Sequence, residues 1–181
     1  PLEDHVVTIT RAHGAVKFPA SFMLVAAMNP TPRGDRPTDE VGRRAMENYL
    51  SRLSGPFLDR IDLHCEAPAV PWKELSRAPT GTGSAQMREQ VLRARETQRA
   101  RQGALTPNAR LSGKQLDVVA PLEEQAKVLL GQAMTEMGLS ARAYDKIRRV
   151  ARTIADIAGE ERVGVAHVAE AVQYRLLDRR V

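Results

Sequence analysis

The sequence predicts an α/β segment followed by an all-α segment, and three features of the chain carry this prediction. An apolar run at residues 22–28 ends at Asn29, as is typical of a strand buried on both faces of a parallel sheet. Prolines and glycines crowd residues 68–84, which indicates a linker. Apolar residues then recur at helical spacing. We therefore expect an α/β domain over 1–70, a linker over 71–84 and a helical domain over 85–181.

The first domain contains short runs with strand-forming residues. Residues 6–10 and 15–18 are β-prone, and the turn Arg11–Gly14 between them suits a hairpin. Further along the chain, the pattern predicts a strand over 22–27, a helix from about 40 to 53, and an alternating strand over 61–66.

The second domain reads as a small bundle of helices with short connections. The pattern predicts helices over 86–101, over 116–119, from Pro121 to Gly138, from the N-cap Ser140 to Gly159, and from about 166. Core stripes are expected at Leu122, Ala126, Leu129, Leu130, Ala133 and Met137, at Tyr144, Ile147, Val150, Ala151, Ile154 and Ile157, and at Val168, Ala169, Val172 and Leu176.

Composition narrows the classes of function. The 181 residues carry a formal charge of +5, from 27 Lys and Arg against 22 Asp and Glu, which permits binding to phosphates or nucleic acid. Aromatic residues make up only 4%, which disfavours a base-stacking platform. A single cysteine, Cys65, excludes an intrachain disulfide and favours a cytoplasmic location. No apolar run approaches the ~18 residues of a membrane span.

Asn29 and Arg60 are candidates for phosphate chemistry. Asn29 ends an apolar strand, where its amide can hold a water beside a phosphate or simply cap a turn before Pro30. Arg60 either pairs with Asp59 or Asp62, which contributes little, or uses its permanently charged fork to stabilise phosphoryl transfer.

Arg142 is a third candidate. It falls in the first turn of a predicted helix, where the helix dipole disfavours a cation. It either reaches Asp145 or Glu136, or helps the helix N-terminus to bind a phosphate.

Further basic residues suggest contacts with nucleic acid. At the hairpin, Arg11 and Lys17 either touch nucleic-acid phosphates or form a solvated basic turn. The four histidines have no metal-ligand spacing, so no metal site is predicted. Glu89 and Glu96 are interspersed in the basic run of the helix over 86–101, and this mixture favours a solvated face over nucleic-acid binding. The run comprises Arg88, Arg93, Arg95, Arg99 and Arg101.

Three blocks of the chain, at 26–30, 51–64 and 151–156, closely resemble the magnesium-chelatase-like family of AAA+ ATPases known as ComM or YifB. The resemblance extends over nearly the whole chain. It implies the distal part of an AAA+ P-loop NTPase core, with its β-hairpin, followed by a C-terminal helical lid bundle. Within that frame, Asn29 is sensor 1, Arg60 is an arginine finger acting on the neighbouring subunit, and Arg142 is sensor 2.

The remaining positions also have counterparts in the family. Arg52 matches a finger less well than Arg60 does. Arg11 and Lys17 correspond to a hairpin that lines the central pore. The loop over 31–39 lacks the cysteines that many members carry, so a metal or redox role of that loop has no support.

The resemblance implies a parent protein that uses ATP and Mg²⁺ and assembles as a ring, with a hexamer expected. DNA is the expected partner, through branch migration during recombination of incoming DNA. The sequence contains no GxxxxGK[ST] phosphate loop and no acidic Mg²⁺-binding motif. We expect both to lie upstream and the isolated chain to be inactive. The alternatives are an ATPase that drives metal insertion, as in magnesium chelatase, and a non-enzymatic assembly or DNA-contacting module.

Overall fold

The structure is a computed structural model, and it describes residues 1–12, 14–29, 31, 39–76, 81–175 and 177. The chain divides into two compact units, Pro1–Arg60 and Ile61–Val181. The mixed α/β composition of the fold is confirmed, although most of the described residues outside loops are helical.

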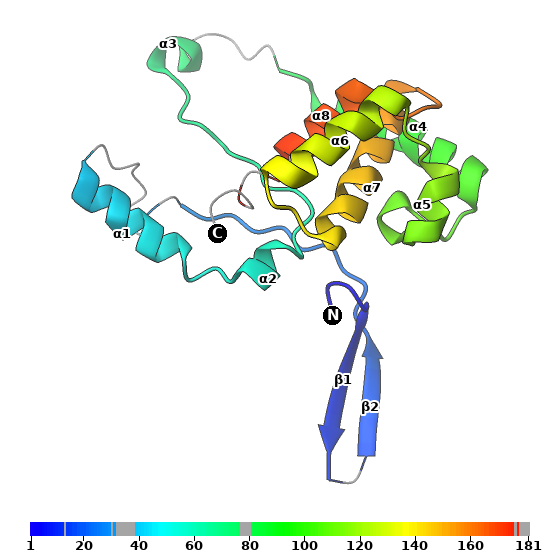
Figure 1. Ribbon diagram of the computed structural model, residues 1–181, viewed down its shortest axis with the longest axis horizontal. Coiled ribbons are helices and arrows are strands. Elements are labelled where there is room, and N and C mark those ends of the chain that lie inside the picture. The colour runs from blue at the N-terminus through cyan, green and yellow to red at the C-terminus, as the bar shows by residue number, and fades with distance from the viewer. Residues whose placement is uncertain (13, 30, 32–38, 77–80, 176, 178–181) are drawn as a thin grey trace. The chain divides into compact units, whose positions relative to one another are not determined.

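The first unit begins with the predicted hairpin (Figure 1). Strand β1 (Val6–Arg11) pairs antiparallel with β2 (Gly14–Pro19), in a register that runs from Val6 opposite Pro19 to Arg11 opposite Gly14. β-branched residues favour the extended backbone, and Gly14 adopts a φ of 146° where the chain reverses. Every residue of the two strands is exposed.

The predicted strand over 22–27 is wrong. These residues form no strand in the structure, and their large apolar side chains are exposed, with Met23 at 86% and Val25 at 80%. A strand of a parallel sheet forms only where neighbouring strands satisfy its backbone groups, and the described residues place none beside it. Asn29 therefore lies in an exposed irregular segment and not at the end of a sheet strand.

Two helices complete the first unit. Helix α1 (Glu40–Leu50) is three residues shorter than predicted, and it begins where the Asp39 carboxylate accepts a hydrogen bond from the Gly42 N–H at 3.1 Å. The short helix α2 (Gly55–Leu58) follows. Most of the cysteine-free loop over 31–39 lies outside the described residues.

The predicted strand over 61–66 is also wrong. Residues 61–70 are irregular, and this segment is tied to the end of the last helix instead of to a sheet. The N–H of His64 donates to the carbonyl of Tyr174 at 2.8 Å, and the buried Arg175 donates from Nη1 to the carbonyl of Ile61. The short helix α3 (Trp72–Leu75) lies in the stretch predicted as a linker.

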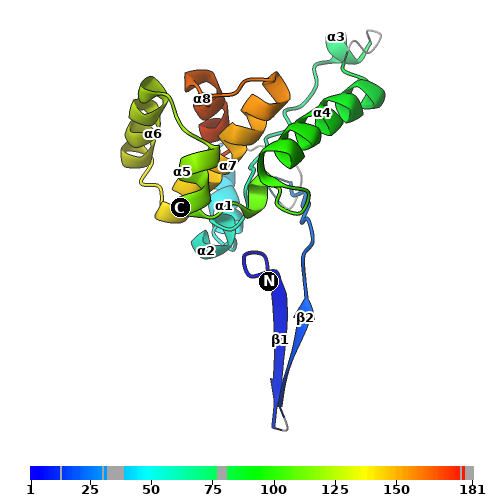
Figure 2. The same ribbon diagram turned by 90° about the vertical axis from the view of Figure 1, so that its right-hand side faces the viewer.

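The second unit is built from helices that pack around α7 (Figures 1 and 2). Helix α7 contacts α4, α5, α8 and the 3₁₀ helix η1, and α6 contacts α8. The bounds of these elements are Ser84–Gln102 for α4, Asn108–Arg110 for η1, Gly113–Val119 for α5, Glu124–Glu136 for α6, Ala141–Ala158 for α7 and Val165–Gln173 for α8.

Helix α6 begins later than predicted. Pro121 precedes the helix instead of occupying its first position, because the backbone at 121–123 pairs with Val163. The N–H of Glu123 donates to the carbonyl of Val163 at 3.1 Å, and the N–H of Val163 donates to the carbonyl of Pro121 at 3.4 Å. The predicted core residues Ala126, Leu130 and Ala133 of α6 are buried.

The predicted stripe of α7 is confirmed in part, since Ile147 and Ala151 are buried and Val150 and Ile154 pack against the core. The buried face consists of alanines and Ile147, with charged residues at its edges, whereas Tyr144 and Ile157 are exposed. Small alanines let neighbouring helices approach closely, and this approach buries the polar side chains that flank them. In α8, Val168 is buried and Val172 packs against the core as predicted, and Leu176 lies outside the described residues.

Candidate functional site

Arg60 follows α2 directly and is the last residue of the first unit. Ser54 begins α2 by accepting a hydrogen bond from the Phe57 N–H at 3.3 Å, and Pro56 lies in the first turn. The Arg60 Nη1 donates to the carbonyl of Pro56 at 2.6 Å, and its Nε lies 3.3 Å from Glu3 Oε2. The side chain retains 37% exposure, so the guanidinium is positioned without being buried.

One partner of Arg60 is a carboxylate that the sequence did not suggest. Glu3 supplies the ion pair, while Asp62 accepts a hydrogen bond from Lys146 at 2.7 Å within the second unit. A surface ion pair of this kind contributes about 0–1 kcal/mol, so exchanging the Glu3 carboxylate for a phosphate oxygen would cost little. Arg52, the other finger candidate, lies exposed in the turn after α1.

Arg142 is the second residue of α7, in the first turn as the sequence predicted, and it is exposed. Ser140 begins this helix by accepting a hydrogen bond from the Ala143 N–H at 3.1 Å. The first turn of a long helix directs N–H groups outward, which makes it a suitable place to bind an anion together with an arginine.

The two basic residues of the hairpin lie on opposite faces. Successive residues of a strand alternate between faces, and the register pairs Arg11 with Gly14 and Lys17 with Thr8. Arg11 therefore shares its face with the apolar Val7, Ile9, Val16 and Phe18, and Lys17 shares the other face with Thr8 and Thr10. The two cations cannot bind one phosphate together. His13, at the predicted turn, lies outside the described residues.

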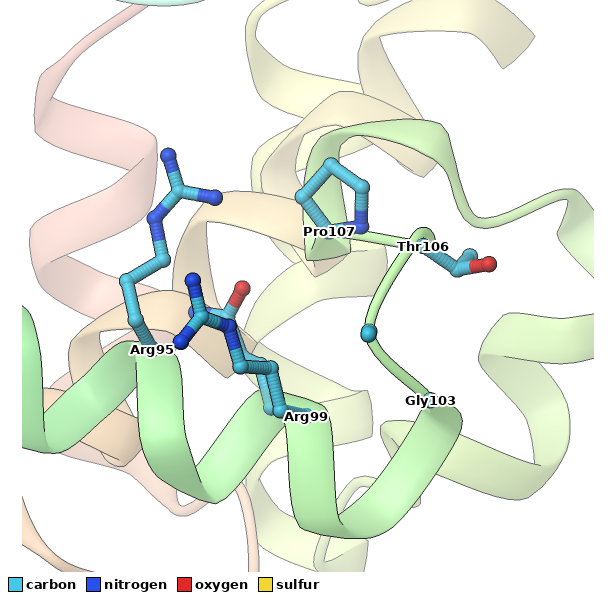
Figure 3. A pocket seen from close by; sticks show the side chains of 7 residues that line it. Arg95, Arg99, Gly103, Thr106 and Pro107 are labelled. Carbon is cyan, nitrogen blue, oxygen red and sulfur yellow. The ribbon is translucent and has the colours of Figure 1, made fainter.

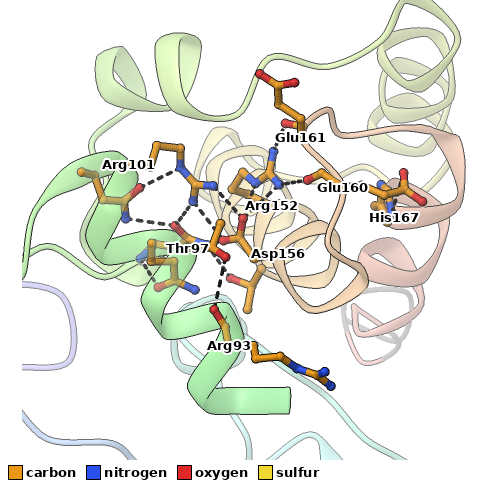
Figure 4. A network of polar contacts seen from close by, with 12 residues as sticks. Arg93, Thr97, Arg101, Arg152, Asp156, Glu160, Glu161 and His167 are labelled. Atoms are coloured by element: carbon orange, nitrogen blue, oxygen red, sulfur yellow. Dashed lines mark hydrogen bonds and ion pairs between the residues drawn. The ribbon is translucent and has the colours of Figure 1, made fainter. Parts of the chain in front are cut away.

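A buried polar cluster joins α4, η1 and α7 around Asp156 (Figure 4). Arg101 donates to the two Asp156 oxygens at 2.6 and 2.9 Å, Asn108 Nδ2 donates at 2.7 Å and Arg152 Nε at 3.0 Å. The side chain of Asp156 is 0% exposed and that of Arg152 is 1% exposed. Arg152 also donates to the carbonyls of Glu160 and Glu161.

Charge and burial shift the pKa values of Asp156 and Arg152 in opposite directions. Burial alone would raise the pKa of Asp156, but hydrogen bonds from Arg101 and Asn108 and the charge of Arg152 outweigh it, and the pKa lies below its ordinary value. Burial lowers the pKa of Arg152, and the Asp156 carboxylate opposes that shift. The carboxylate is therefore ionised at neutral pH and holds the second unit together.

Sequence reasoning did not identify this cluster, although a signal for it was present. Arg152 and Asp156 are four residues apart, so a helix brings them to one face. That face also carries Ala151 and Ala155, which are completely buried. A charged pair beside these small apolar residues indicates burial with an additional partner, which here is Arg101.

The predicted site residues divide between the two units. Asn29, Arg60 and the hairpin cations belong to the first unit, and Arg142 belongs to the second. In the part of the chain that the structure describes, no group of three or more His, Cys, Asp and Glu residues could hold a metal ion. None of the described helices combines the length and the apolar character needed to cross a membrane.

Comparisons with known proteins match both units to one family. Residues 1–75 match the family described as magnesium chelatase, subunit ChlI, and residues 81–175 match magnesium chelatase, subunit ChlI C-terminal. The chain is 43% identical to competence protein ComM of Haemophilus influenzae over 99% of its own length and 35% of that protein's.

Other relatives show the same pattern of coverage. The uncharacterized protein YifB of Escherichia coli is 40% identical over 99% of this chain and 36% of its own length. The uncharacterized protein Rv2897c of Mycobacterium tuberculosis is 36% identical over 97% of this chain and 35% of its own length. The chain thus spans about a third of the curated relatives that it matches. With both of its parts matched in order, the chain belongs to the magnesium-chelatase-like family that includes ComM and YifB.

Proposed function

We propose that this chain forms the distal part of a Mg²⁺-dependent AAA+ ATPase that assembles as a ring, with six subunits expected, and moves DNA. The observation that carries the proposal is the ordered match of residues 1–75 and 81–175 to the two parts of the ChlI family. The expected division into an α/β core part over 1–70, a linker over 71–84 and a lid over 85–181 belongs to this proposal, and so does a cytoplasmic location.

In this proposal Arg60 completes the ATP site of the neighbouring subunit. Its guanidinium is exposed, permanently charged and held by contacts that a phosphate can replace. A planar fork of donors stabilises the charge that develops on a transferred phosphoryl group. Arg142 at the start of α7 binds phosphate as sensor 2, and Asn29 orients the attacking water as sensor 1.

ATP and Mg²⁺ are the cofactors that the family implies, and the residues present fit one part of such a site. The chain supplies guanidinium and amide donors but contains no GxxxxGK[ST] segment to cradle the phosphates. The described residues also offer no cluster of three candidate metal ligands. The chain therefore completes an ATP site and does not hydrolyse ATP by itself. Bound ATP would supply the phosphoryl-transfer energy for movement.

DNA is the proposed partner for two reasons. The chain carries a net charge of +5, which favours association with a polyanion. One relative is named a competence protein, and competence is the uptake of DNA by a cell. A second candidate function, ATP-driven metal insertion, is favoured by the name of the matched family.

The test of the finger assignment is ATP turnover by the full-length parent carrying Arg60→Ala. We expect turnover to fall at least a hundredfold, because an arginine finger contributes about 10³- to 10⁵-fold, while ATP binding stays within a few-fold. Arg44→Ala is the matched control, since the ion pair that Arg44 forms with the described residues is an exposed one with Glu40. Equal turnover in the Arg60 and Arg44 variants would remove the assignment.

A further inference from the structure

The structure separates the five arginines of the basic run on α4 into three groups. Arg93 lies 3.7 Å from Glu89 in an ion pair whose two side chains are both 67% exposed. Arg101 turns inward and binds Asp156. The other three are exposed and make no ion pair with any residue that the structure describes; they are Arg88, Arg95 and Arg99.

These three arginines form one stripe along the helix, which we call the α4 arginine stripe. At about 100° per residue, Arg88, Arg95 and Arg99 fall within about 40° of one another around the axis. Glu89 and Glu96 lie roughly 60 to 120° away around the axis, and no ion pair joins either of them to the stripe in the described residues. The run mixes basic and acidic residues in the sequence, but the helix gathers these three arginines on one side.

The arrangement has a cost that the fold does not explain. Arg95 and Arg99 are neighbours at i and i+4, and a like-charged pair at that spacing destabilises a helix by about 0.2–0.5 kcal/mol. No carboxylate of the described residues forms an ion pair with either arginine. An anionic ligand that binds both guanidinium groups would offset it.

A pocket lies beside the stripe and has a fixed opposite wall (Figure 3). It is lined by Arg95 and Arg99 on α4 and by the loop from Gly103 to Pro107, where Gly103 reverses the chain with a φ of 88°. Figure 3 shows both guanidinium groups on the same side of α4.

Hydrogen bonds between the helix and the loop hold the pocket in shape. The buried Gln98 accepts from the N–H of Asn108 at 3.3 Å. Gln102 Nε2 donates to the carbonyl of Thr106 at 2.7 Å and to Asn108 Oδ1 at 3.0 Å. The pocket is therefore built before a ligand arrives, which reduces the ordering cost of binding.

We propose that the α4 arginine stripe binds the phosphate backbone of nucleic acid, with the Arg95–Arg99 pocket as its central phosphate site. Three arginines spread over about 16 Å of helix suit a polymer of phosphates better than a single nucleotide. Helix α4 carries no aromatic residue, so the contact reads the backbone and not the bases. The inference rests on the proposed function only in taking DNA as the partner.

The test measures DNA affinity of the 181-residue chain as a function of salt. Labelled single-stranded and duplex DNA of equal length are titrated between 50 and 200 mM salt. Each of Arg88→Ala, Arg95→Ala and Arg99→Ala should reduce the salt slope by about 0.7 for single strands or 0.9 for duplex. Arg93→Ala, on the same helix, is the matched control and should leave the slope unchanged.

Each outcome decides the matter. Because the three side chains are exposed, the variants should unfold at the temperature of the parent chain or slightly above it, and this is checked first. Equal slopes in the stripe variants and in Arg93→Ala, or no DNA binding by the unaltered chain, would overturn the proposal. Competition by poly-glutamate as effective as by DNA per charge would overturn it too, because the stripe would then not select phosphates.

The proposed ATPase is tested separately in the full-length parent. DNA-stimulated turnover with unchanged slopes would refute the stripe alone. Reduced slopes together with an absence of ATP hydrolysis would refute the motor alone.

Discussion

Replacing Asp156 by alanine should destabilise the second unit severely. The substitution removes a fully buried carboxylate that accepts hydrogen bonds from Arg101, Asn108 and Arg152. It leaves the guanidinium of Arg152 buried, with two carbonyl groups but no counter-charge. Removing one partner of a buried ion pair costs about 3–5 kcal/mol.

A loss of this size is readily measured. For a unit of about 120 residues, 3–5 kcal/mol corresponds to a fall of about 12–20 °C in Tm. Urea unfolding followed by circular dichroism gives the free energy of unfolding directly. Glu89→Ala is the control, because its exposed pair with Arg93 should contribute less than about 1 kcal/mol. A loss below about 1 kcal/mol for Asp156→Ala would refute the assignment of Asp156 as the centre of the cluster.

Three further outcomes are expected. The pKa of Asp156 is lowered by folding, so the stability that its carboxylate contributes is complete above the unfolded pKa of about 4 and is lost as the pH falls through the lower folded pKa. The difference in unfolding free energy between the parent chain and Asp156→Asn should therefore shrink below about pH 4. A difference that grew in acid would contradict this. An added Cβ meets no neighbouring atom at Gly159 or at Gly131, so the backbone conformation decides the effect of each alanine substitution. Gly159→Ala should cost about 1–2 kcal/mol because of its φ of 78°, whereas Gly131→Ala inside α6 should stabilise by about 0.5–1 kcal/mol. Thermal unfolding checks the pair, and equal effects would contradict the conformational argument. Arg11→Ala in the full-length parent should weaken DNA binding and DNA-stimulated turnover, and unchanged affinity would leave the hairpin an ordinary turn.

Local patterns predicted the parts of the fold that depend on local chemistry. The hairpin over residues 6–19 follows from β-branched residues on both sides of a glycine turn. Ser140 and Gly159 delimit α7 as predicted, because a side-chain cap and a left-handed glycine act within a few residues.

The failures share a physical origin in long-range partners. The apolar run at 22–27 has strand composition, but a strand needs neighbours that the run itself does not encode. The segment at 61–66 pairs with the end of α8 and not with a sheet. Pro121 precedes α6 because the backbone at 121–123 forms hydrogen bonds with Val163, 42 positions away, instead of a first helical turn.

Only some of the candidate site residues could be proposed from the sequence, because others depend on long-range partners. Arg60 and Arg142 are site predictions that rest on sequence segments resembling the family. The α4 arginine stripe could not be read from composition alone, because the fold decides which arginine turns inward to Asp156 and which stay exposed.

The central proposal is that the parent of this chain is an ATPase that moves DNA and is stimulated by it. The most direct test is ATP hydrolysis by the full-length parent, with and without branched DNA, and with and without porphyrin and Mg²⁺ as chelatase substrates. We predict hydrolysis that DNA stimulates and that porphyrin does not. Stimulation by the porphyrin system alone would contradict it in favour of metal insertion, and an absence of hydrolysis under every condition would contradict it in favour of an assembly module.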